Sequence, residues 1–236
     1  MNRIFLSIII IVLLTACTPS ESAVQTAIAQ TQAANPTSTS TPQPTSTLTP
    51  TATPDVRVIK TDPKEFLLAL DDLPSQGKYV LPNANWITPH HNSEVIQDRG
   101  AEAGKKYINE TGRIDGWLVS YKRSVKNNPL PAEIFDNVVS YQTAEGAKLT
   151  VTKYLDDLFA DGFTEISDHN TIGDITRVFI KKKDGYVWYD IFFTYKNYYH
   201  DVEGYGLETD VSPKVIEDIA RDLLKKLIDA PLSSPY

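Results

Sequence analysis

Residues 35–54 limit where this chain can form a folded core. Sixteen of these twenty positions are Thr, Ser or Pro. Such a tract has almost nothing apolar to bury and cannot offset its own ordering entropy, while its prolines favour extended polyproline geometry. At roughly 3.1 Å per residue it would hold a domain tens of ångströms from its point of attachment. The sequence therefore predicts a disordered tether, and the folded part of the chain must follow it.

The segment before the tether has the layout of a bacterial export signal. Arg3 precedes the apolar run 8–14, which is too short to span a bilayer. Small residues follow and lead to Cys17. The sequence Leu14-Thr15-Ala16-Cys17 resembles the lipobox of bacterial lipoproteins. That resemblance implies cleavage before Cys17 and lipidation of its thiol, including palmitate, as the anchor in the membrane.

These features predict a location outside the cytoplasm, on the bacterial cell membrane. We expect residues 1–16 to be removed as a signal peptide and residues 17–54 to form the lipidated N-terminus and the tether. The lipid on Cys17 would supply most of the attachment, at roughly 0.8 kcal/mol for each buried methylene. The Ser, Thr and Pro content is shared by O-glycosylated stalks, so a glycosylated stalk and a plain spacer are both open alternatives.

Composition excludes several classes of function. The chain has 30 acidic and 23 basic side chains, for a net charge of −7, which argues against nucleic acid as a partner. Cys17 is the only cysteine, so the chain has no disulfide, no cysteine-based metal site and no thiol nucleophile in the folded part. We also find no nucleophile elbow, Walker loop or dinucleotide-binding glycine motif. We predict no cofactor.

Residues 55–230 have the length and the alternating periodicities of one α+β domain, with residues 231–236 as a C-terminal tail. Apolar residues at helical spacing predict helices, one capped by the Thr143 hydroxyl and another capped by the Ser212 hydroxyl with Pro213 at its first position. Asp184-Gly185 predicts a hairpin. The main predicted helices are 93–110, 144–158 and 213–227, and the main predicted strands are 113–123, 134–141, 175–182, 186–196 and 198–207.

Hairpins favour antiparallel pairing, and the amphipathic helices must cover the resulting sheet. We therefore predict an α+β fold, an antiparallel sheet covered by amphipathic helices. The order of these elements is similar to that of the PsbP-like family of exported or lumenal proteins. The resemblance implies this architecture and transfers no function. Within the helix 93–110, we expect Gly100 to lie close against the sheet, because glycine costs about 1 kcal/mol of helix propensity relative to alanine.

Aromatic residues concentrate in the segment 186–205, which holds nine of the 23 aromatics of the chain. Alternation along the strand 186–196 separates an apolar set, suited to the core, from a set that contains Tyr186, Trp188 and Asp190. Two amphipathic rings beside a carboxylate suit recognition of a saccharide or a peptide. The alternative is that these aromatics only pack across strands, where such residues are common.

Two further groups are weak candidates for cation sites. His90 and His91 with Glu94 are the best candidates for a metal site, but zinc needs three or four ligands, so an exposed loop before a helix is the alternative. The segment 201–206 resembles a calcium loop with misplaced ligands. We expect a solvated acidic turn there, and predict no metal.

The sequence favours a lipid-anchored envelope protein with a non-catalytic binding or accessory domain. Its partners would be the membrane, through Cys17, and a saccharide or a protein of the envelope. One alternative is a hydrolase of envelope polymers, which would need two carboxylates close together in a cleft. Another is a structural lipoprotein that stabilises a partner. An exposed aromatic patch rimmed by polar groups would favour binding.

Overall fold

The computed structural model describes residues 55–235, apart from positions 84, 85 and 127. Cys17, the predicted signal peptide 1–16 and the predicted tether lie outside the described residues, so these assignments stay predictions. The described part is an α+β fold built on an antiparallel sheet, which confirms the predicted fold class.

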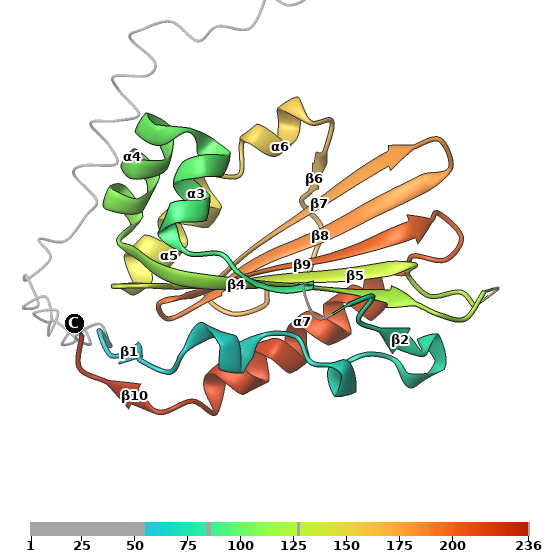
Figure 1. Ribbon diagram of the computed structural model, residues 1–236, viewed down its shortest axis with the longest axis horizontal. Coiled ribbons are helices and arrows are strands. Elements are labelled where there is room, and N and C mark those ends of the chain that lie inside the picture. The colour runs from blue at the N-terminus through green and yellow to red at the C-terminus, as the bar shows by residue number, and fades with distance from the viewer. Residues whose placement is uncertain (1–54, 84–85, 127, 236) are drawn as a thin grey trace, which may run out of the picture. The chain divides into compact units, whose positions relative to one another are not determined.

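The sheet runs through the centre of the domain (Figure 1). Among the described residues its strand order is β2-β4-β5-β9-β8-β7-β6, and β3 pairs with β4 as well. Every neighbouring pair is antiparallel. The strands are β2 (Tyr79–Val80), β3 (Ile87–Pro89), β4 (Arg113–Arg123), β5 (Glu133–Tyr141), β6 (Thr164–Ile166), β7 (Ile175–Lys183), β8 (Tyr186–Tyr195) and β9 (Tyr198–Leu207).

Helices cover both faces of this sheet (Figure 1). The long helix α7 packs against β8 and β9 on one face, and α5 packs against the same strands on the other. A small second sheet pairs β1 (Val58–Ile59) with β10 (Leu232–Ser233). The α-helices are α3 (Asn92–Arg99), α4 (Ala101–Thr111), α5 (Ala144–Lys153), α6 (Asp157–Ala160) and α7 (Pro213–Ile228), and short 3-10 turns span Pro63–Phe66, Leu70–Asp72 and Ser75–Gly77.

Local sequence signals explain where several elements begin and end. The Thr143 hydroxyl accepts a hydrogen bond from the Gly146 N–H at 3.1 Å and caps α5, as predicted. Pro213 occupies the first turn of α7 as predicted, where its missing N–H leaves no donor unpaired, but the Ser212 hydroxyl makes no capping hydrogen bond, so the cap predicted there is wrong. Asp184 and Gly185 both have positive φ, at 54° and 80°, which is the backbone of a tight hairpin turn. The Thr143 cap, the position of Pro213 and the hairpin are therefore confirmed.

The predicted single helix 93–110 is wrong at Gly100. Its φ of 83° ends α3 and starts α4, and no atom would lie within 4 Å of an added Cβ. Glycine is therefore needed there for its left-handed backbone and not for close packing. The close approach falls at Gly104, where an added Cβ would lie 2.6 Å from the Ile96 Cα, so α3 and α4 pack tightly on each other.

Two further segments differ from the predicted elements. The helix expected over 144–158 ends at Lys153, and the short helix α6 follows it after a break. The segment 231–236, expected to be a tail, contributes β10, which pairs with β1 near the start of the domain.

Two apolar clusters form the core, one on each face of the sheet. The larger lies under α7 and contains the apolar set of β8, which confirms the predicted core face of that strand. The smaller lies under α5. The larger cluster includes Val187, Tyr189, Ile191, Phe193, Val202, Ile216, Ile219 and Leu223, and the smaller includes Val139, Tyr141, Ala147, Val151, Phe179, Phe192 and Tyr199.

Asn197, in the turn between β8 and β9, joins three parts of the domain. It is fully buried, its Oδ1 accepts from the Ile59 N–H at 2.7 Å, and its Nδ2 donates to the Ile59 and Tyr141 carbonyls at 3.0 and 2.9 Å. Buried polar groups of this kind are kept because each donor and acceptor is satisfied. Asn197 thereby fixes β1 and the end of β5 against the central hairpin.

Candidate functional site

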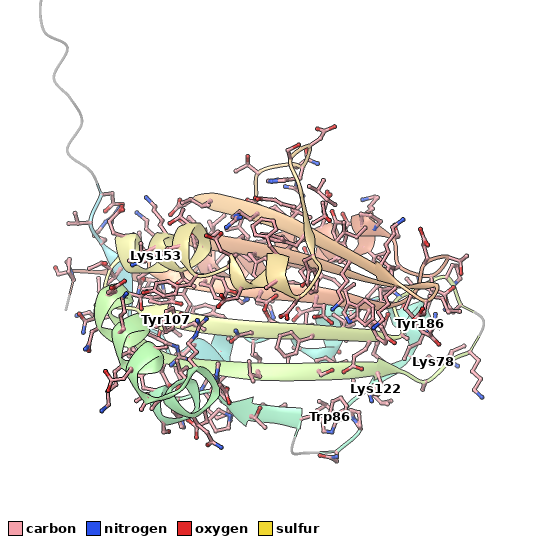
Figure 2. All side chains as sticks on the ribbon, turned by 90° about the horizontal axis from the view of Figure 1, so that it is seen from above. Lys78, Trp86, Tyr107, Lys122, Lys153 and Tyr186 are labelled. Atoms are coloured by element: carbon pink, nitrogen blue, oxygen red, sulfur yellow. The ribbon has the colours of Figure 1, made fainter. Side chains whose placement is uncertain are left out.

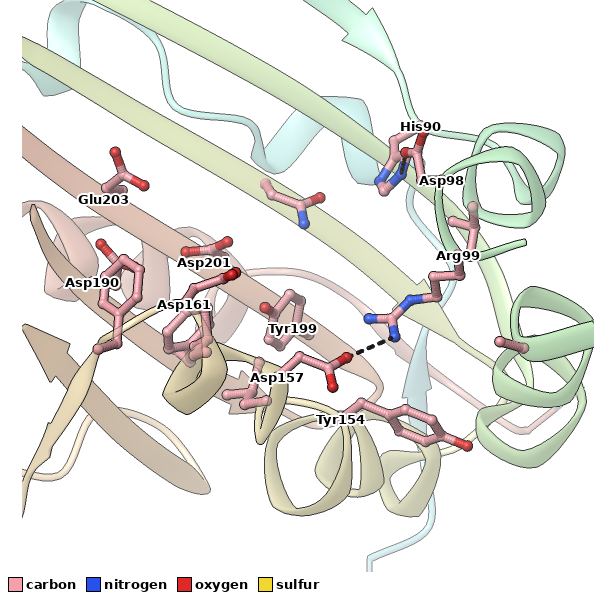
Figure 3. Close-up of a pocket in the computed structure, with 17 residues that line it drawn as sticks. His90, Asp98, Arg99, Tyr154, Asp157, Asp161, Asp190, Tyr199, Asp201 and Glu203 are labelled. Carbon is pink, nitrogen blue, oxygen red and sulfur yellow. Dashed lines mark ion pairs between the residues drawn. The ribbon is translucent and has the colours of Figure 1, made fainter. Parts of the chain in front are cut away.

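A cavity of about 610 Å³ lies on the α5 side of the sheet (Figure 3). Strands β5, β8 and β9 form its floor, and residues of α3, α4, α6 and the segment after α5 form its walls. The volume is within the range of pockets that bind small molecules. Its lining is divided between carboxyl groups and an apolar wall.

The carboxyl groups of the cavity fall into two sets. Three lie on the floor, where the residues are buried or half-buried, and three lie on the rim, where the residues are exposed. The floor carboxyls are Asp190, Asp201 and Glu203, and the rim carboxyls are Asp98, Asp157 and Asp161.

Strand register brings the floor carboxyls together. Asp190 of β8 lies directly across from Glu203 of β9, and Asn137 of β5 lies directly across from Asp201. Side chains alternate along a strand, so Asp201 and Glu203 share one face, and directly opposed Cβ atoms are about 4.5–5.5 Å apart. Four polar side chains from three strands therefore lie side by side on the cavity floor.

Burial and mutual repulsion disfavour the charged forms of the floor carboxyls. Burial raises the pKa of Asp190 well above its ordinary range, and the nearby Glu203 and Asp201 raise it further. The pKa of Asp201 is raised in the same way by burial, then by Glu203 and Asp136. Burial and Glu133 raise the pKa of Glu203 from 4.5 to about 7. All three shifts are upward, as expected for clustered acids in a low dielectric.

Some polar atoms of the floor have no hydrogen-bond partner. Oδ1 of Asp190 and Oδ1 of Asn137 are both buried and unpaired among the described residues, and Asp190 is only 3 % exposed. Native structures leave few buried acceptors unsatisfied, and each one needs an explanation. Since both side chains line the cavity, a ligand in the cavity could supply the missing donors.

The two basic side chains of the lining lie against carboxyls of the rim, and Nδ1 of His90 is buried without a partner among the described residues. Arg99 lies 4.0 Å from Asp157 on the rim, and its guanidinium lies over the rings of Tyr107 and Tyr154 at 4.6 and 5.7 Å. The pKa of His90 is lowered, chiefly by burial, so this ring is neutral at pH 7. Neither side chain neutralises the floor carboxyls.

The rest of the wall is apolar. It is contributed mainly by α3, the segment after α5 and the sheet, and it adjoins the smaller core cluster. A pocket with an apolar wall and a few convergent polar groups is the usual form of a small-molecule site. The apolar wall consists of Val95, Leu155, Leu158, Phe163 and Phe192, with the ring of Tyr199 beside them.

The predicted binding residues Tyr186 and Trp188 lie on the same face of the sheet but do not line the cavity. Tyr186 stacks on Tyr205 with ring centroids 5.6 Å apart, and Trp188 lies 4.7 Å from the same ring. We call Tyr186, Trp188 and Tyr205 the aromatic shelf. Tyr186 is 40 % exposed and lies at the end of the molecule opposite Tyr107 (Figure 2).

Polar side chains border the aromatic shelf, as a binding patch would require. The Lys181 Nζ lies 5.4 Å from the centre of the Trp188 ring and 5.2 Å from the Phe163 ring. Glu133 accepts a hydrogen bond from the Ser120 hydroxyl at 2.5 Å on the neighbouring strands. Of the predicted set, only Asp190 therefore belongs to the cavity, and the two rings belong to an adjacent surface.

The candidate metal group His90, His91 and Glu94 is not brought together. His90 Nε2 lies 3.5 Å from Asp98, while His91 Nδ1 lies 2.7 Å from Asp115, whose hydrogen bond raises the pKa of that imidazole. Glu94 accepts a hydrogen bond from the Ser93 hydroxyl at 2.7 Å. Across the residues that the structure describes, no three or more His, Cys, Asp or Glu side chains are grouped so as to hold a metal ion.

The solvated turn expected at 201–206 is wrong, whereas the strand predicted over 198–207 is confirmed as β9. These residues lie inside β9, and Asp201 and Glu203 point to the cavity floor. Gly204 and Gly206 give this strand the composition of a turn. In the strand, an added Cβ at Gly204 would meet the Ile216 side chain at 2.3 Å, so this glycine makes room for α7. The spacing of two between Asp201 and Glu203 was the available signal that both carboxyls share one face.

Comparisons with known proteins identify no family for this chain. No protein-family model matches it, and no curated protein matches it. Among solved structures it is similar to the extracellular domain of PknH from Mycobacterium tuberculosis, with 14% sequence identity and a TM-score of 0.44, over 70% of this chain and 94% of that chain. A likeness at this level carries no argument about function. Among the residues described, no helix has the length and apolarity needed to cross a lipid bilayer.

Proposed function

We propose that this chain is an exported, lipid-anchored protein of the bacterial cell envelope whose domain binds a small ligand in the acidic cavity. The anchor rests on the lipobox-like sequence that ends at Cys17 and on the tether that follows it. The binding role rests on one observation above all. Asp190 presents a buried, unpaired acceptor in a cavity of ligand size, beside two further carboxyls of raised pKa.

The arrangement is costly for the protein in the absence of a ligand. A buried acceptor without a partner costs about 1–3 kcal/mol, and clustered buried acids add repulsion. Functional sites are common places for such costs, because a ligand that pairs with the polar groups removes them. The ligand should therefore be rich in hydrogen-bond donors.

We place binding ahead of hydrolysis because the buried Oδ1 of Asp190 lacks a partner that a ligand in the cavity would supply. A glycosidase needs one carboxyl that keeps its proton and a second that stays ionised. Burial raises the pKa of Asp190, Asp201 and Glu203 alike and marks none of the three as the ionised partner. The bordered aromatic shelf likewise supports a binding role over a purely structural one, and it offers rings on which a saccharide portion of the ligand could stack.

A cavity-blocking variant tests the binding role. Ala103 is exposed on α4 and lines the cavity, so Ala103→Trp should fill the mouth without disturbing the core. Ala101→Trp is the matched control, because Ala101 is exposed on the same helix and does not line the cavity. Both variants of the full chain, in detergent micelles, should fold as judged by circular dichroism.

The readout is a thermal-shift panel of envelope saccharides, organic amines, calcium and zinc. A ligand at a hundred times its Kd adds about 2.7 kcal/mol, or about 5–10 °C for a domain of this size. We expect at least one organic probe to stabilise the wild type and Ala101→Trp but not Ala103→Trp. Equal shifts in all three proteins, or no shift with any organic probe, would contradict a ligand site in this cavity.

The anchor has a separate test in the producing bacterium. Labelled palmitate should be incorporated into the wild type and not into Cys17→Ser, and the variant should leave the membrane fraction. Cys17 is the only cysteine of the chain, so no other thiol can take its place. A Cys17→Ser protein that still carries label would refute lipidation at this residue.

A further inference from the structure

The lining of the cavity is far more acidic than the chain as a whole. It contains six carboxyl groups but only one arginine and one histidine. Charges of one sign in a low-dielectric concavity reinforce each other and attract ligands of the opposite sign. The acidic lining therefore favours a ligand that carries positive charge as well as hydrogen-bond donors.

Among the described residues no basic side chain forms an ion pair with the carboxyls of the cavity floor, and Lys181 offsets their charge only from a distance. Of the described residues, Lys181 is the positive group that favours the ionised forms of Asp190 and Glu203, and its Nζ lies over the rings of Trp188 and Phe163. Arg99 is held by Asp157 and by two tyrosine rings. The space beside the floor carboxyls, where a paired basic side chain would be expected, is therefore open toward the cavity.

The unpaired atoms of the floor are acceptors of one kind. Asn137 of β5 lies across from Asp201 of β9, and Asp190 of β8 lies across from Glu203 of β9, so their Oδ1 atoms stand at the two ends of a diagonal row that Asp201 and Glu203 continue between them. Such a row of oxygens matches an ammonium or a guanidinium group, which offers several N–H donors and no acceptor. A neutral hydroxyl would supply donors but would leave the repulsion between the carboxyls in place.

Resting on the proposed binding function, the geometry points to a small organic cation as the ligand. Its ammonium or guanidinium head lies on the floor among Asp190, Asp201 and Glu203, and its apolar body lies against the wall formed by Leu155, Leu158 and Phe163. The cavity of about 610 Å³ accommodates both parts. The carboxyls are not grouped as metal ligands among the described residues, so the site suits an extended organic cation better than a metal ion.

The test compares two probes that differ in charge and share a shape. Binding of 2-phenylethylammonium and of 2-phenylethanol to the full chain in detergent micelles is measured by calorimetry at pH 8, with calcium chloride and cellobiose as further probes. The proteins are wild type, Ala103→Trp, Glu203→Gln and Glu102→Gln. Glu102 is an exposed acid of α4 outside the cavity, so its variant removes the same charge elsewhere.

We expect saturable binding of 2-phenylethylammonium to the wild type, with 2-phenylethanol at least about tenfold weaker. Loss of one charge partner in a buried pair typically weakens binding by tenfold or more, so Glu203→Gln should bind the ammonium probe at least about tenfold less tightly. Glu102→Gln should match the wild type within about twofold, and Ala103→Trp should not bind.

The outcomes separate this inference from the proposed function. If 2-phenylethanol or cellobiose binds as tightly as the ammonium probe and Ala103→Trp abolishes that binding, the cavity is a ligand site but its ligand is not a cation. If Glu203→Gln binds the ammonium probe as tightly as the wild type, the floor carboxyls do not recognise it and the inference is overturned. If calcium binds and the ammonium probe does not, the organic-cation assignment is wrong. If no organic probe of either panel binds, both proposals fail.

Discussion

Removal of the Glu203 charge should make the ligand-free protein more stable at alkaline pH. Burial raises the pKa of Glu203 from 4.5 to about 7 in the folded state. The folded protein therefore binds this proton more tightly than the unfolded chain does. Stability from this group is fully present below pH 4.5 and is lost as the pH rises through about 7.

The size of the effect follows from the same pKa values. A pKa that differs by one between the folded and the unfolded state changes the free energy of unfolding by about 1.4 kcal/mol. The two pKa values of Glu203 therefore correspond to about 3 kcal/mol, which partial exposure of the side chain reduces to about 2–3 kcal/mol. Glu203→Gln keeps the shape of the protonated acid and cannot ionise. The variant should therefore match the wild type at pH 4 and exceed its stability at pH 8 by about 2–3 kcal/mol, or by about 5–10 °C in Tm.

The assay is urea unfolding of the full chain at pH 4 and pH 8, with Glu102→Gln as the control for charge alone. Only the difference between variant and wild type is interpreted, because many other acids titrate over this range. A Glu203→Gln protein that is no more stable than the wild type at pH 8 would refute the reasoning. So would a gain of the same size at both pH values, because it would come from packing and not from ionisation.

Three other predictions concern the architecture and the aromatic shelf. Gly100→Ala should lower the free energy of unfolding by about 1–2 kcal/mol because of the φ of 83° at this position. Gly104→Ala should lower it more, since the new Cβ would lie 2.6 Å from the Ile96 Cα. Urea unfolding that reverses this order would contradict the packing of α3 on α4. Asn197→Ala removes three buried hydrogen bonds and should cost about 2–4 kcal/mol in the same assay, and a loss below about 1 kcal/mol would show that water replaces the amide. Trp188→Ala should abolish binding of any saccharide that stacks on the aromatic shelf while leaving the melt nearly intact and 2-phenylethylammonium binding unchanged within about threefold. A large drop in Tm would instead make Trp188 a core residue.

Much of the fold follows from local patterns in the sequence. The alternation in β8 identifies its core face, and Asp184-Gly185 identifies the hairpin that joins it to β7. Thr143 and Pro213 mark the beginnings of α5 and α7. Each of these signals is contained within a few residues, so a single sequence is enough to reveal it.

The errors arose where one composition is compatible with two structures. Gly100 fits a close helix contact as well as a left-handed break, and only the backbone conformation distinguishes them. The sequence predicts a strand over 198–207, but the glycines and acids of 201–206 also have the composition of a turn, and the pairing of β9 on both sides decides for the strand. Tertiary pairing overrides local preference in such segments.

The candidate site could be predicted only in part. Asp190 was identified from its place in the aromatic strand, but the cavity also needs Asp98 from α3 and Glu203 from β9, which are more than a hundred positions apart in the chain. No spacing rule connects such residues. The raised pKa values depend on burial and on neighbours across strands, and both are properties of the assembled fold.

The pKa of the Glu203 carboxyl tests the central claim most directly. It can be followed by carbon-13 NMR of the side-chain carboxyl in the full chain, with Glu203→Gln used to assign the resonance. The account predicts a midpoint of about 7 in the ligand-free protein and a lower midpoint when 2-phenylethylammonium is bound. A midpoint near the ordinary value of 4.5 in the ligand-free protein would show that the floor of the cavity is solvated, and would contradict the account.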